Sequence, residues 1–255
     1  MRSAVTLLGS GDAFNAGGRG HSCYLVEDAA GACAVDFGAT ALGALKRLGK
    51  SAAAIGSVLL THLHGDHFAG LPFLFIEGLY REPRGPLIIA GPPGVEERVR
   101  TLAAACYRDI FGQPLPFELR FVEWQADRAV DVAGRRVVPL PAHHQDLPER
   151  SYSLRLASGG ITLAFTGDTG WSDRLAEAIG DADLLVAECS LWDDGYDRHL
   201  GRADWERLLP SLRGRRVVAA HLGEEALAHQ RDLLALAAAS GVDLTVGQDF
   251  LRVEL

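Results

Sequence analysis

Four side chains that can bind a metal ion lie within six residues of one another: His62, His64, Asp66 and His67. They follow the apolar segment 58–60 and occupy the loop after a predicted strand. Imidazole and carboxylate groups together suit zinc, manganese or iron, and the absence of cysteine disfavours a purely structural zinc site. Such a loop can turn the first two histidines toward one ion and Asp66 and His67 toward a second. The alternative, a histidine-rich surface loop, would crowd four ligand-type groups without a cation, so we interpret the segment as a metal site.

The elements that must position these groups are predicted from short apolar runs and from helical spacing. We expect strands at 4–8, 23–26, 32–36, 58–60, 87–90, 136–140, 153–156, 161–165, 184–187, 217–220, 244–246 and 250–253. We expect helices at 40–48, 94–106, 173–179, 202–212 and 224–239. This mixture indicates an α/β (α+β) fold: a four-layer αββα sandwich of two mixed β-sheets flanked by helices, in a single domain over residues 1–255.

Two predicted strands end alike, which suggests an internal duplication. Segments 58–62 and 163–168 are both apolar strands that finish in Thr and a potential metal ligand. A duplicated half-domain would place both strand ends at one edge of the sandwich, where α/β proteins usually carry their active groups. Near the C-terminus, segment 247–251 reads as a closing hairpin between the last two strands.

The segment Thr-His-Leu-His-Gly-Asp-His-Phe-Ala-Gly-Leu-Pro at 61–72 resembles the signature of the metallo-β-lactamase superfamily, and its Gly-Leu-Pro ending is similar to the ribonuclease Z-like branch. The resemblance covers nearly the whole chain. Its further motifs are Val35-Asp36-Phe37-Gly38, Ala90-Gly91-Pro92-Pro93-Gly94, Phe165-Thr166-Gly167-Asp168-Thr169 and Ala219-Ala220-His221-Leu222. In this family the Asp of the first of these motifs supports the metal site without binding the ions, which implies that role for Asp36.

The resemblance implies a set of metal ligands. The first ion would take His62, His64 and one of the neighbours His143 and His144, and the family spacing Pro-x-x-His from Pro141 favours His144. The second ion would take the following group of ligands: Asp66, His67 and His221. Asp168 would bridge the two ions. Taken alone, an Asp in a Gly-Asp-Thr turn usually satisfies local backbone donors, and only its company here favours metal binding.

Two further residues resemble a proton-donating pair of ribonuclease Z-like enzymes. Glu188 lies where those enzymes carry a His-Glu-Ala-Thr motif, here Ala-Glu-Cys-Ser, and His199 lies where they carry a histidine held by that Glu. We therefore expect His199 to donate a proton to the leaving oxygen while Glu188 orients it. The alternative is a solvent-exposed loop histidine with an unrelated buried Glu. The Gly-rich segments 9–12 and 17–21 read mainly as turns that would rim the site, with Arg19 or His21 able to meet a charged substrate.

The predicted function is a dinuclear metal-dependent hydrolase with two divalent ions, Zn first and Mn or Fe as alternatives. A hydroxide bridging the ions would attack phosphorus or a carbonyl carbon, with Asp66 and Asp168 positioning it. No Gly-x-Ser-x-Gly motif is present, which fits a mechanism without an activated serine. We expect a phosphodiesterase acting on a small or nucleotide-like ester. Two alternatives stay open: a hydrolase of carboxylic esters, lactones or thioesters, and a non-catalytic metal-binding sensor.

Charge and length bear on the partners of the protein. A formal net charge of −8 argues against affinity built on broad phosphate neutralisation. Ribonuclease Z proper carries a long basic arm between its third and fourth motifs, whereas only residues 145–167 separate them here, which argues against transfer RNA as a substrate. The chain has no apolar stretch of the roughly 20 residues that span a membrane and no signal-type apolar run, so we expect a cytoplasmic protein. The resemblance also implies a homodimer.

Overall fold

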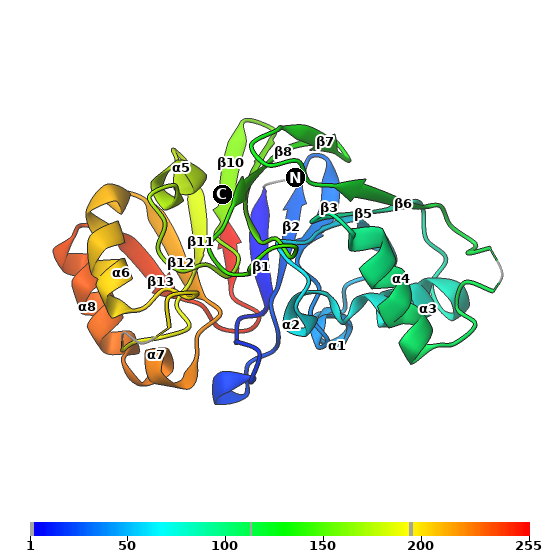
Figure 1. Cartoon of the computed structure of the whole chain (residues 1–255), viewed down its shortest axis with the longest axis horizontal. Helices are drawn as coiled ribbons and strands as arrows, with labels where there is room; N and C mark the ends of the chain where they lie inside the picture. The colour runs from blue at the N-terminus through cyan, green and yellow to red at the C-terminus, as the bar shows by residue number, and fades with distance from the viewer. Residues whose placement is uncertain (1–2, 113, 194–195) are drawn as a thin grey trace.

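The computed structural model describes residues 3–112, 114–193 and 196–255, and its β-strands form two seven-stranded sheets (Figure 1). The first sheet contains, in spatial order, β14 (Arg252–Glu254), β1 (Ala4–Gly9), β2 (Cys23–Asp28), β3 (Gly31–Val35), β4 (Ile55–Leu59), β5 (Leu87–Gly91) and β6 (Leu119–Glu123). The second contains β7 (Val130–Val132), β8 (Arg135–Pro141), β9 (Tyr152–Ser158), β10 (Ile161–Phe165), β11 (Leu184–Glu188), β12 (Arg216–Ala220) and β13 (Asp243–Val246). Each sheet mixes antiparallel and parallel pairs, as expected from the sequence.

Helices cover the outer face of each sheet, which completes the predicted four-layer sandwich (Figure 1). Over the first sheet lie α1 (Ala41–Arg47), α2 (Gly65–Phe68), α3 (Leu71–Tyr80) and α4 (Val95–Cys106), and over the second lie α5 (Leu175–Ile179), α6 (Arg202–Leu208), α7 (Glu224–Ala228) and α8 (Gln230–Ala239). Short 3-10 turns are η1 (Ala16–Gly18), η2 (Ala52–Ala54) and η3 (Leu209–Leu212). Within the described residues, no helix combines the length and the apolar character needed to cross a membrane.

Side chains of successive strand residues alternate between two cores, as the pleat of a β-strand requires. In β4, Val58 packs among the helices of the first half while Leu59 packs between the sheets. In β11, Val186 lies between the sheets while Leu185 lies under the helices of the second half. The sheets therefore share one central apolar layer, and each has a second layer under its own helices. This double burial explains why the central strands read as unbroken apolar runs.

The two sheets repeat one pattern of strand pairing. In the orders β14-β1-β2-β3-β4-β5-β6 and β7-β8-β9-β10-β11-β12-β13, the first three pairs are antiparallel and the last three are parallel. The predicted duplication is therefore visible in the topology. The sequence analysis, however, paired β4 with β10. In the structure β10 occupies the place of β3, and β11 occupies the place of β4.

The structure differs from the sequence-based elements in several places. The strands β6 and β7 were not predicted, because their residues are only partly buried and carry little apolar signal. The helices predicted at 202–212 and 224–239 are each divided, the second at His229, whose imidazole pairs with Asp232 and stacks on Trp192. The closing hairpin at 247–251 is wrong. That segment crosses between the sheets, since β13 pairs with β12 and β14 pairs with β1.

Candidate metal centre

The candidate site lies where strands of both halves end. The ligand-type segment 61–67 follows β4, Asp168 follows β10 and His221 follows β12. His144 lies in the loop after β8. Parallel neighbours place their carboxyl ends at one edge of a sheet, so two packed sheets bring several strand ends together.

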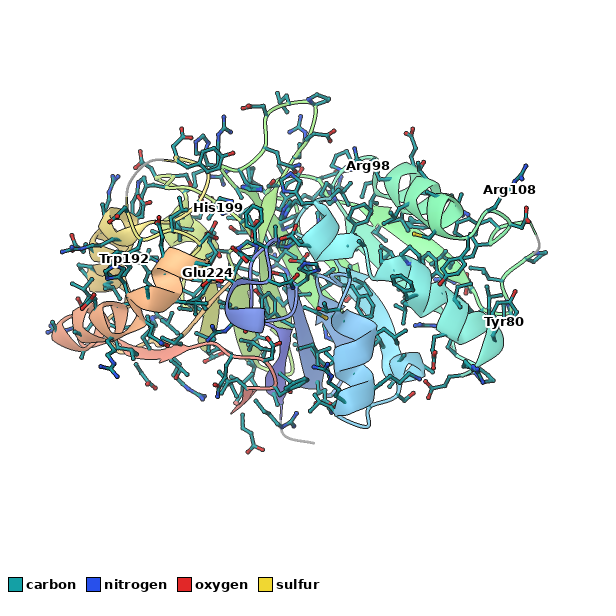
Figure 2. The ribbon with its side chains drawn as sticks, turned by 90° about the horizontal axis from the view of Figure 1, so that it is seen from below. Tyr80, Arg98, Arg108, Trp192, His199 and Glu224 are labelled. Carbon is teal, nitrogen blue, oxygen red and sulfur yellow. The ribbon has the colours of Figure 1, made fainter. Side chains whose placement is uncertain are left out.

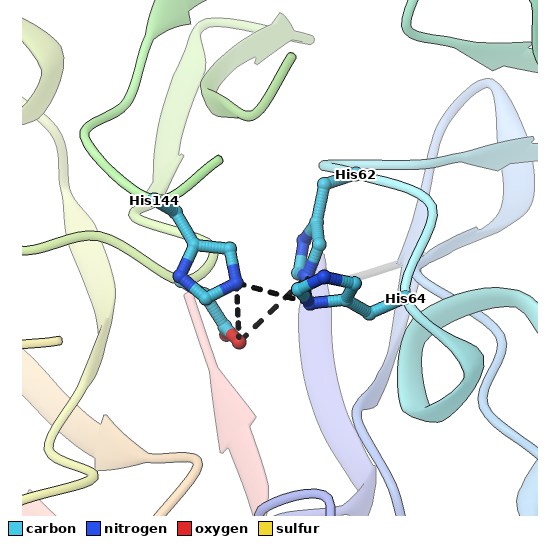
Figure 3. A group of neighbouring side chains, drawn as sticks. His62, His64 and His144 are labelled. Atoms are coloured by element: carbon cyan, nitrogen blue, oxygen red, sulfur yellow. Dashed lines mark hydrogen bonds and ion pairs between the residues drawn. The ribbon is translucent and has the colours of Figure 1, made fainter. Parts of the chain in front are cut away.

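The first group contains His62, His64, His144 and Asp168, and its candidate ligand atoms lie within 4.8 Å of one another. The Nδ1 atom of His64 is 3.1 Å from Nε2 of His62 and 3.0 Å from Nε2 of His144. Figure 3 shows the three imidazoles converging from two sides. An oxygen of Asp168 is 3.7 Å from Nε2 of His62 and from Nε2 of His144. Three imidazoles and one carboxylate therefore face a common point.

The second group contains Asp66, His67, Asp168 and His221, all of them buried. The Oδ2 atom of Asp66 is 3.3 Å from Nε2 of His67 and 3.2 Å from Nε2 of His221. The Oδ1 atom of Asp168 is 3.3 Å and 3.4 Å from the same two nitrogens. Because its other oxygen faces the first group, Asp168 lies between the two groups, where a bridging carboxylate would lie.

Each of the five imidazoles has a partner on the nitrogen that points away from the site. The outer partners are Thr61 Oγ1 for His62, Gln145 for His64, Asp36 for His67, the carbonyl of Arg198 for His144 and Ser190 Oγ for His221. The carbonyl of Arg198 can only accept, so Nδ1 of His144 carries the proton and Nε2 faces inward without one. Outer partners of this kind fix the ring orientation and the tautomer of metal-binding histidines.

Asp36 supports this arrangement from beneath. Its carboxylate accepts hydrogen bonds from the Thr61 backbone and hydroxyl and from Nδ1 of His67. Because it donates to Asp36, the Thr61 hydroxyl accepts a hydrogen bond from Nδ1 of His62. Asp36 and His221 both have left-handed backbones, with φ of 57° and 51°. Strained non-glycine residues of this kind cluster at functional sites.

The residues fit a pair of cations, because the centre is rich in acceptors and poor in donors. Oδ1 of Asp168 is buried and has no hydrogen-bond partner in the described part of the chain, although two imidazole nitrogens lie close by. Oxygen and nitrogen lone pairs that face one another without protons need a positive charge between them. Carboxylate and imidazole ligands suit divalent zinc, manganese or iron.

The charge states of the first group agree with this reading. Burial lowers the pKa of His62, His64 and His144, which keeps these three imidazoles neutral. Burial alone would raise the pKa of Asp168, but His221 and His67 hold it well below its usual range. The carboxylate is therefore ionised, and the first group presents neutral nitrogens beside a negative charge.

The pair of His199 and Glu188 adjoins the second group through His221. Nδ1 of His199 lies 2.9 Å from Oε1 of Glu188, which is buried and also accepts from the backbone of Thr169. Burial alone would lower the pKa of His199, but the Glu188 carboxylate raises it to about 9. The imidazole is therefore protonated at neutral pH. Figure 2 labels His199 near the middle of the face that it views.

The remaining sequence-based candidates lie outside these groups. His143 is partly exposed and its ring points to Asp197, 3.5 Å away, so His144 alone of the pair joins the cluster. Three aromatic residues near the motifs also lie apart from the groups: Tyr152 and Trp192 are buried in the apolar cores, and Trp171 stacks under the guanidinium of Arg207. Sequence reasoning gave no role to Ser190, Gln145 or Thr61. Thr61 and Ser190 lie within quoted motifs and Gln145 directly follows His144, but nothing in the sequence indicated which side chain each would hold.

A family model described as a β-lactamase superfamily domain matches residues 33–222, so the chain belongs to that superfamily. Ribonuclease Z of Mycobacterium bovis strain BCG Pasteur is 32% identical over 194 residues, covering 71% of this chain and 68% of that protein. The resemblance to the ribonuclease Z-like branch is thereby confirmed. The family implies divalent metal ions, for which the two groups of ligand-type residues are suited.

Two further proteins define the range of similarity. An uncharacterized protein of Mycobacterium tuberculosis strain H37Rv is 32% identical over 159 residues, which cover 61% of this chain. The match spans only 56% of that relative's own length. The metallo-β-lactamase fold protein YhfI of Bacillus subtilis superposes with a TM-score of 0.81 at 21% identity, covering 99% of this chain and 98% of the other. This likeness confirms the predicted sandwich fold.

Proposed function

We propose that the protein is a dinuclear metal-dependent hydrolase that cleaves phosphodiester bonds of small or nucleotide-like substrates. The observation that carries the proposal is the placement of Asp168 between two groups of inward-facing nitrogens and oxygens, with one carboxylate oxygen left without a hydrogen bond. His62, His64 and His144 would hold one ion. Asp66, His67 and His221 would hold the other, and Asp168 would contact both.

Two bound divalent ions lower the pKa of water and stabilise negative charge that develops on the substrate. The protein's own residues supply the rest. As a water that has lost one proton to solvent bonds to phosphorus through its oxygen, the bond from phosphorus to the leaving oxygen breaks, and His199 transfers its Nε2 proton to that leaving oxygen. Glu188 holds the opposite nitrogen of the ring, 2.9 Å away, and so keeps Nε2 directed outward from the pair.

The protonated His199 favours phosphodiesters of poor leaving groups. An alkoxide leaves with difficulty unless it is protonated, and an acid with a pKa of about 9 stays charged at neutral pH. The outer end of β9–β10 favours small substrates, because Gly159 and Gly160 alone connect these strands. The long arm expected of an enzyme that grips transfer RNA has no place there, although mycobacterial relatives named ribonuclease Z make precursor transfer RNA a necessary comparison.

The test combines metal content with substrate preference. We expect close to two ions per chain by elemental analysis of protein purified without chelators, and fewer in Asp168→Ala. The matched control is Asp243→Ala, which removes an exposed aspartate of β13 far from the ligand groups and should keep both ions. The wild type should hydrolyse bis(p-nitrophenyl) phosphate in preference to p-nitrophenyl acetate and precursor transfer RNA.

Two outcomes contradict the proposal. A single ion that added zinc or manganese cannot supplement would remove the dinuclear site. Full occupancy with faster turnover of the acetate than of the phosphodiester would replace phosphodiester cleavage with carboxylic ester hydrolysis on the same metals.

A further inference from the structure

A cavity of about 460 Å³ lies beside the candidate metal centre, between residues 15–20, one face of α1 and residues 249–250. Residues of one wall follow, in the sequence, a glycine that packs on the metal-binding segment. Thr40 lines the cavity, and its hydroxyl accepts a hydrogen bond from the backbone of His21. Gly38, two residues before Thr40, packs so closely on the backbone of Asp66 and on His21 that a Cβ would not fit. Ala39 and Gly20, which line the cavity, thus directly adjoin Gly38 and His21, and Gly38 contacts both His21 and the backbone of Asp66.

Two arginines line the cavity from opposite walls. Arg19 comes from the loop that carries η1, and Arg47 comes from the last turn of α1. Neither has an acidic partner in the part of the chain that the structure describes, and the buried Nε of Arg19 has no hydrogen bond there at all. A chain of net charge −8 thus leaves two guanidinium groups unneutralised around one hollow.

The single carboxylate that lines the cavity does not offset these charges. Oδ1 of Asp249 accepts from the backbone and hydroxyl of Ser10, and Oδ2 accepts from the backbone of Gly20. Three donors occupy its oxygens, so Asp249 serves to fasten the loop to the end of the chain. The field in the cavity is therefore set mainly by the arginines.

The loop that carries Arg19 is held in place by hydrogen bonds. Asn15, in a left-handed conformation, donates its side-chain amide to the carbonyl of Arg19, whose own N–H bonds to Ala16. The backbone of Gly17 donates to Glu224 of α7, which Figure 2 places beside this loop. The backbone of Arg19 is thus fixed from two sides. Little further ordering of this backbone would be needed to bind a ligand.

The floor of the cavity is apolar and kept open. Leu8 and Ala44 are buried there, and Phe250 is half-buried. Gly43 lies in the interior of α1, where glycine is a poor helix former. A Cβ at Gly43 would meet no atom within 4 Å, so packing does not require glycine at this position. What the missing side chain does provide is room between Arg47 and the loop.

We propose that this cavity binds a phosphate group of the substrate that is not the one hydrolysed. The inference rests on the proposed function, and it narrows the substrate class to phosphodiesters that carry a second phosphate. A phosphate offers the oxygens that two guanidinium groups recognise. The apolar floor suits the carbon skeleton that joins the two phosphates, and the volume lies in the range of small-molecule sites.

The test compares two ligands that differ by one phosphate, thymidine 5′-monophosphate and thymidine 3′,5′-bisphosphate, on the metal-loaded protein. Calorimetry gives their affinities, and inhibition of bis(p-nitrophenyl) phosphate hydrolysis gives their competition. We expect the bisphosphate to bind about tenfold more tightly than the monophosphate, as one pair of charge-assisted hydrogen bonds provides. In Arg19→Ala and Arg47→Ala this difference should disappear while the affinity for the monophosphate is kept.

Two further variants serve as controls for this interpretation. Gly43→Leu fills the cavity without removing a charge and should also abolish the difference. Arg231→Ala removes an exposed arginine of α8, outside the cavity, and should preserve it. Equal binding of the two ligands by wild type, or a difference that persists in both cavity-arginine variants, would overturn the inference. A difference in affinity that depends on the arginines, without hydrolysis of any diester, would support phosphate binding in the cavity and refute the proposed function. Hydrolysis of diesters without this difference would support the proposed function and refute phosphate binding in the cavity.

Discussion

The hydroxyl of Ser190 connects the two parts of the candidate site, and removing it gives a demanding test of the geometry. Ser190 Oγ donates to Oε2 of Glu188 at 2.6 Å, so it can accept the proton of His221 Nδ1 at 2.8 Å. The other oxygen of Glu188 holds His199. One buried carboxylate therefore orients His199 directly and His221 through Ser190.

The size of the effect follows from these contacts. In Ser190→Ala, His221 Nδ1 loses its acceptor, and the tautomer with a proton on Nε2, which cannot bind a cation, becomes accessible. Losing an outer partner of a metal-binding histidine costs roughly 10–100-fold in metal affinity, about 1.4–2.7 kcal/mol. The short, charge-assisted bond to Glu188 places the expectation in the upper half of this range. Only the ion bound by His221 should be affected.

The assay is competition for zinc between the loaded protein and a fluorescent chelator, which resolves one weakened ion from one unchanged ion. Ser153→Ala is the matched control, because Ser153 is equally buried and donates one short bond to the carbonyl of Thr166 without touching a histidine. Both variants should lose stability, about 1–3 kcal/mol. Ser190→Thr keeps the hydroxyl and should restore the affinity. Wild-type affinity in Ser190→Ala, or no rescue by Thr, would refute the reasoning.

Two further predictions concern acidity and the buried ion pair. Glu188 raises the pKa of His199 to about 9, so if His199 acts as an acid, kcat should fall as the pH rises through about 9. Glu188→Gln should move this fall to lower pH. His199→Ala should reduce turnover while both ions are retained. A pH profile in which His199→Ala keeps the wild-type rate and limb would contradict the role. Arg135 and Asp28 form a buried pair at 2.7 Å, so Arg135→Leu should cost about 3–5 kcal/mol in chemical denaturation, and adding Asp28→Leu should recover much of it. An unchanged midpoint in the single variant would show that the pair contributes nothing.

The sequence predicts the sandwich and the ligand-type segment for one physical reason. Central strands buried on both faces read as unbroken apolar runs, and functional groups at their carboxyl ends stand out against them. The runs before His62 and Asp168 show both features. The edge strands β6 and β7 lack an unbroken apolar run, and the sequence analysis did not predict them.

The supporting contacts could not be predicted in the same way. His64 and His144 are held by Gln145 and by the carbonyl of Arg198, and these partners come close only through the path of two loops. A backbone carbonyl carries no signal in the sequence. The segment 247–251 failed for a related reason, because a short polar turn looks the same whether it joins neighbouring strands or crosses between sheets.

The repeated topology explains how the two halves share the work of the site. Strand β3 leads to Asp36, which accepts a hydrogen bond from His67, whereas its counterpart β10 leads to Asp168, which belongs to both groups of ligand-type residues. Strand β4 leads to His62 and its neighbours, whereas its counterpart β11 ends at Glu188, which is hydrogen-bonded to Ser190 and His199. Equivalent strand ends thus differ in role: where one half carries a ligand, the other carries its support. A duplication whose halves diverged in this complementary way needs both sheets to complete either group, which is why the ligand-type residues are scattered along the chain yet meet at one edge.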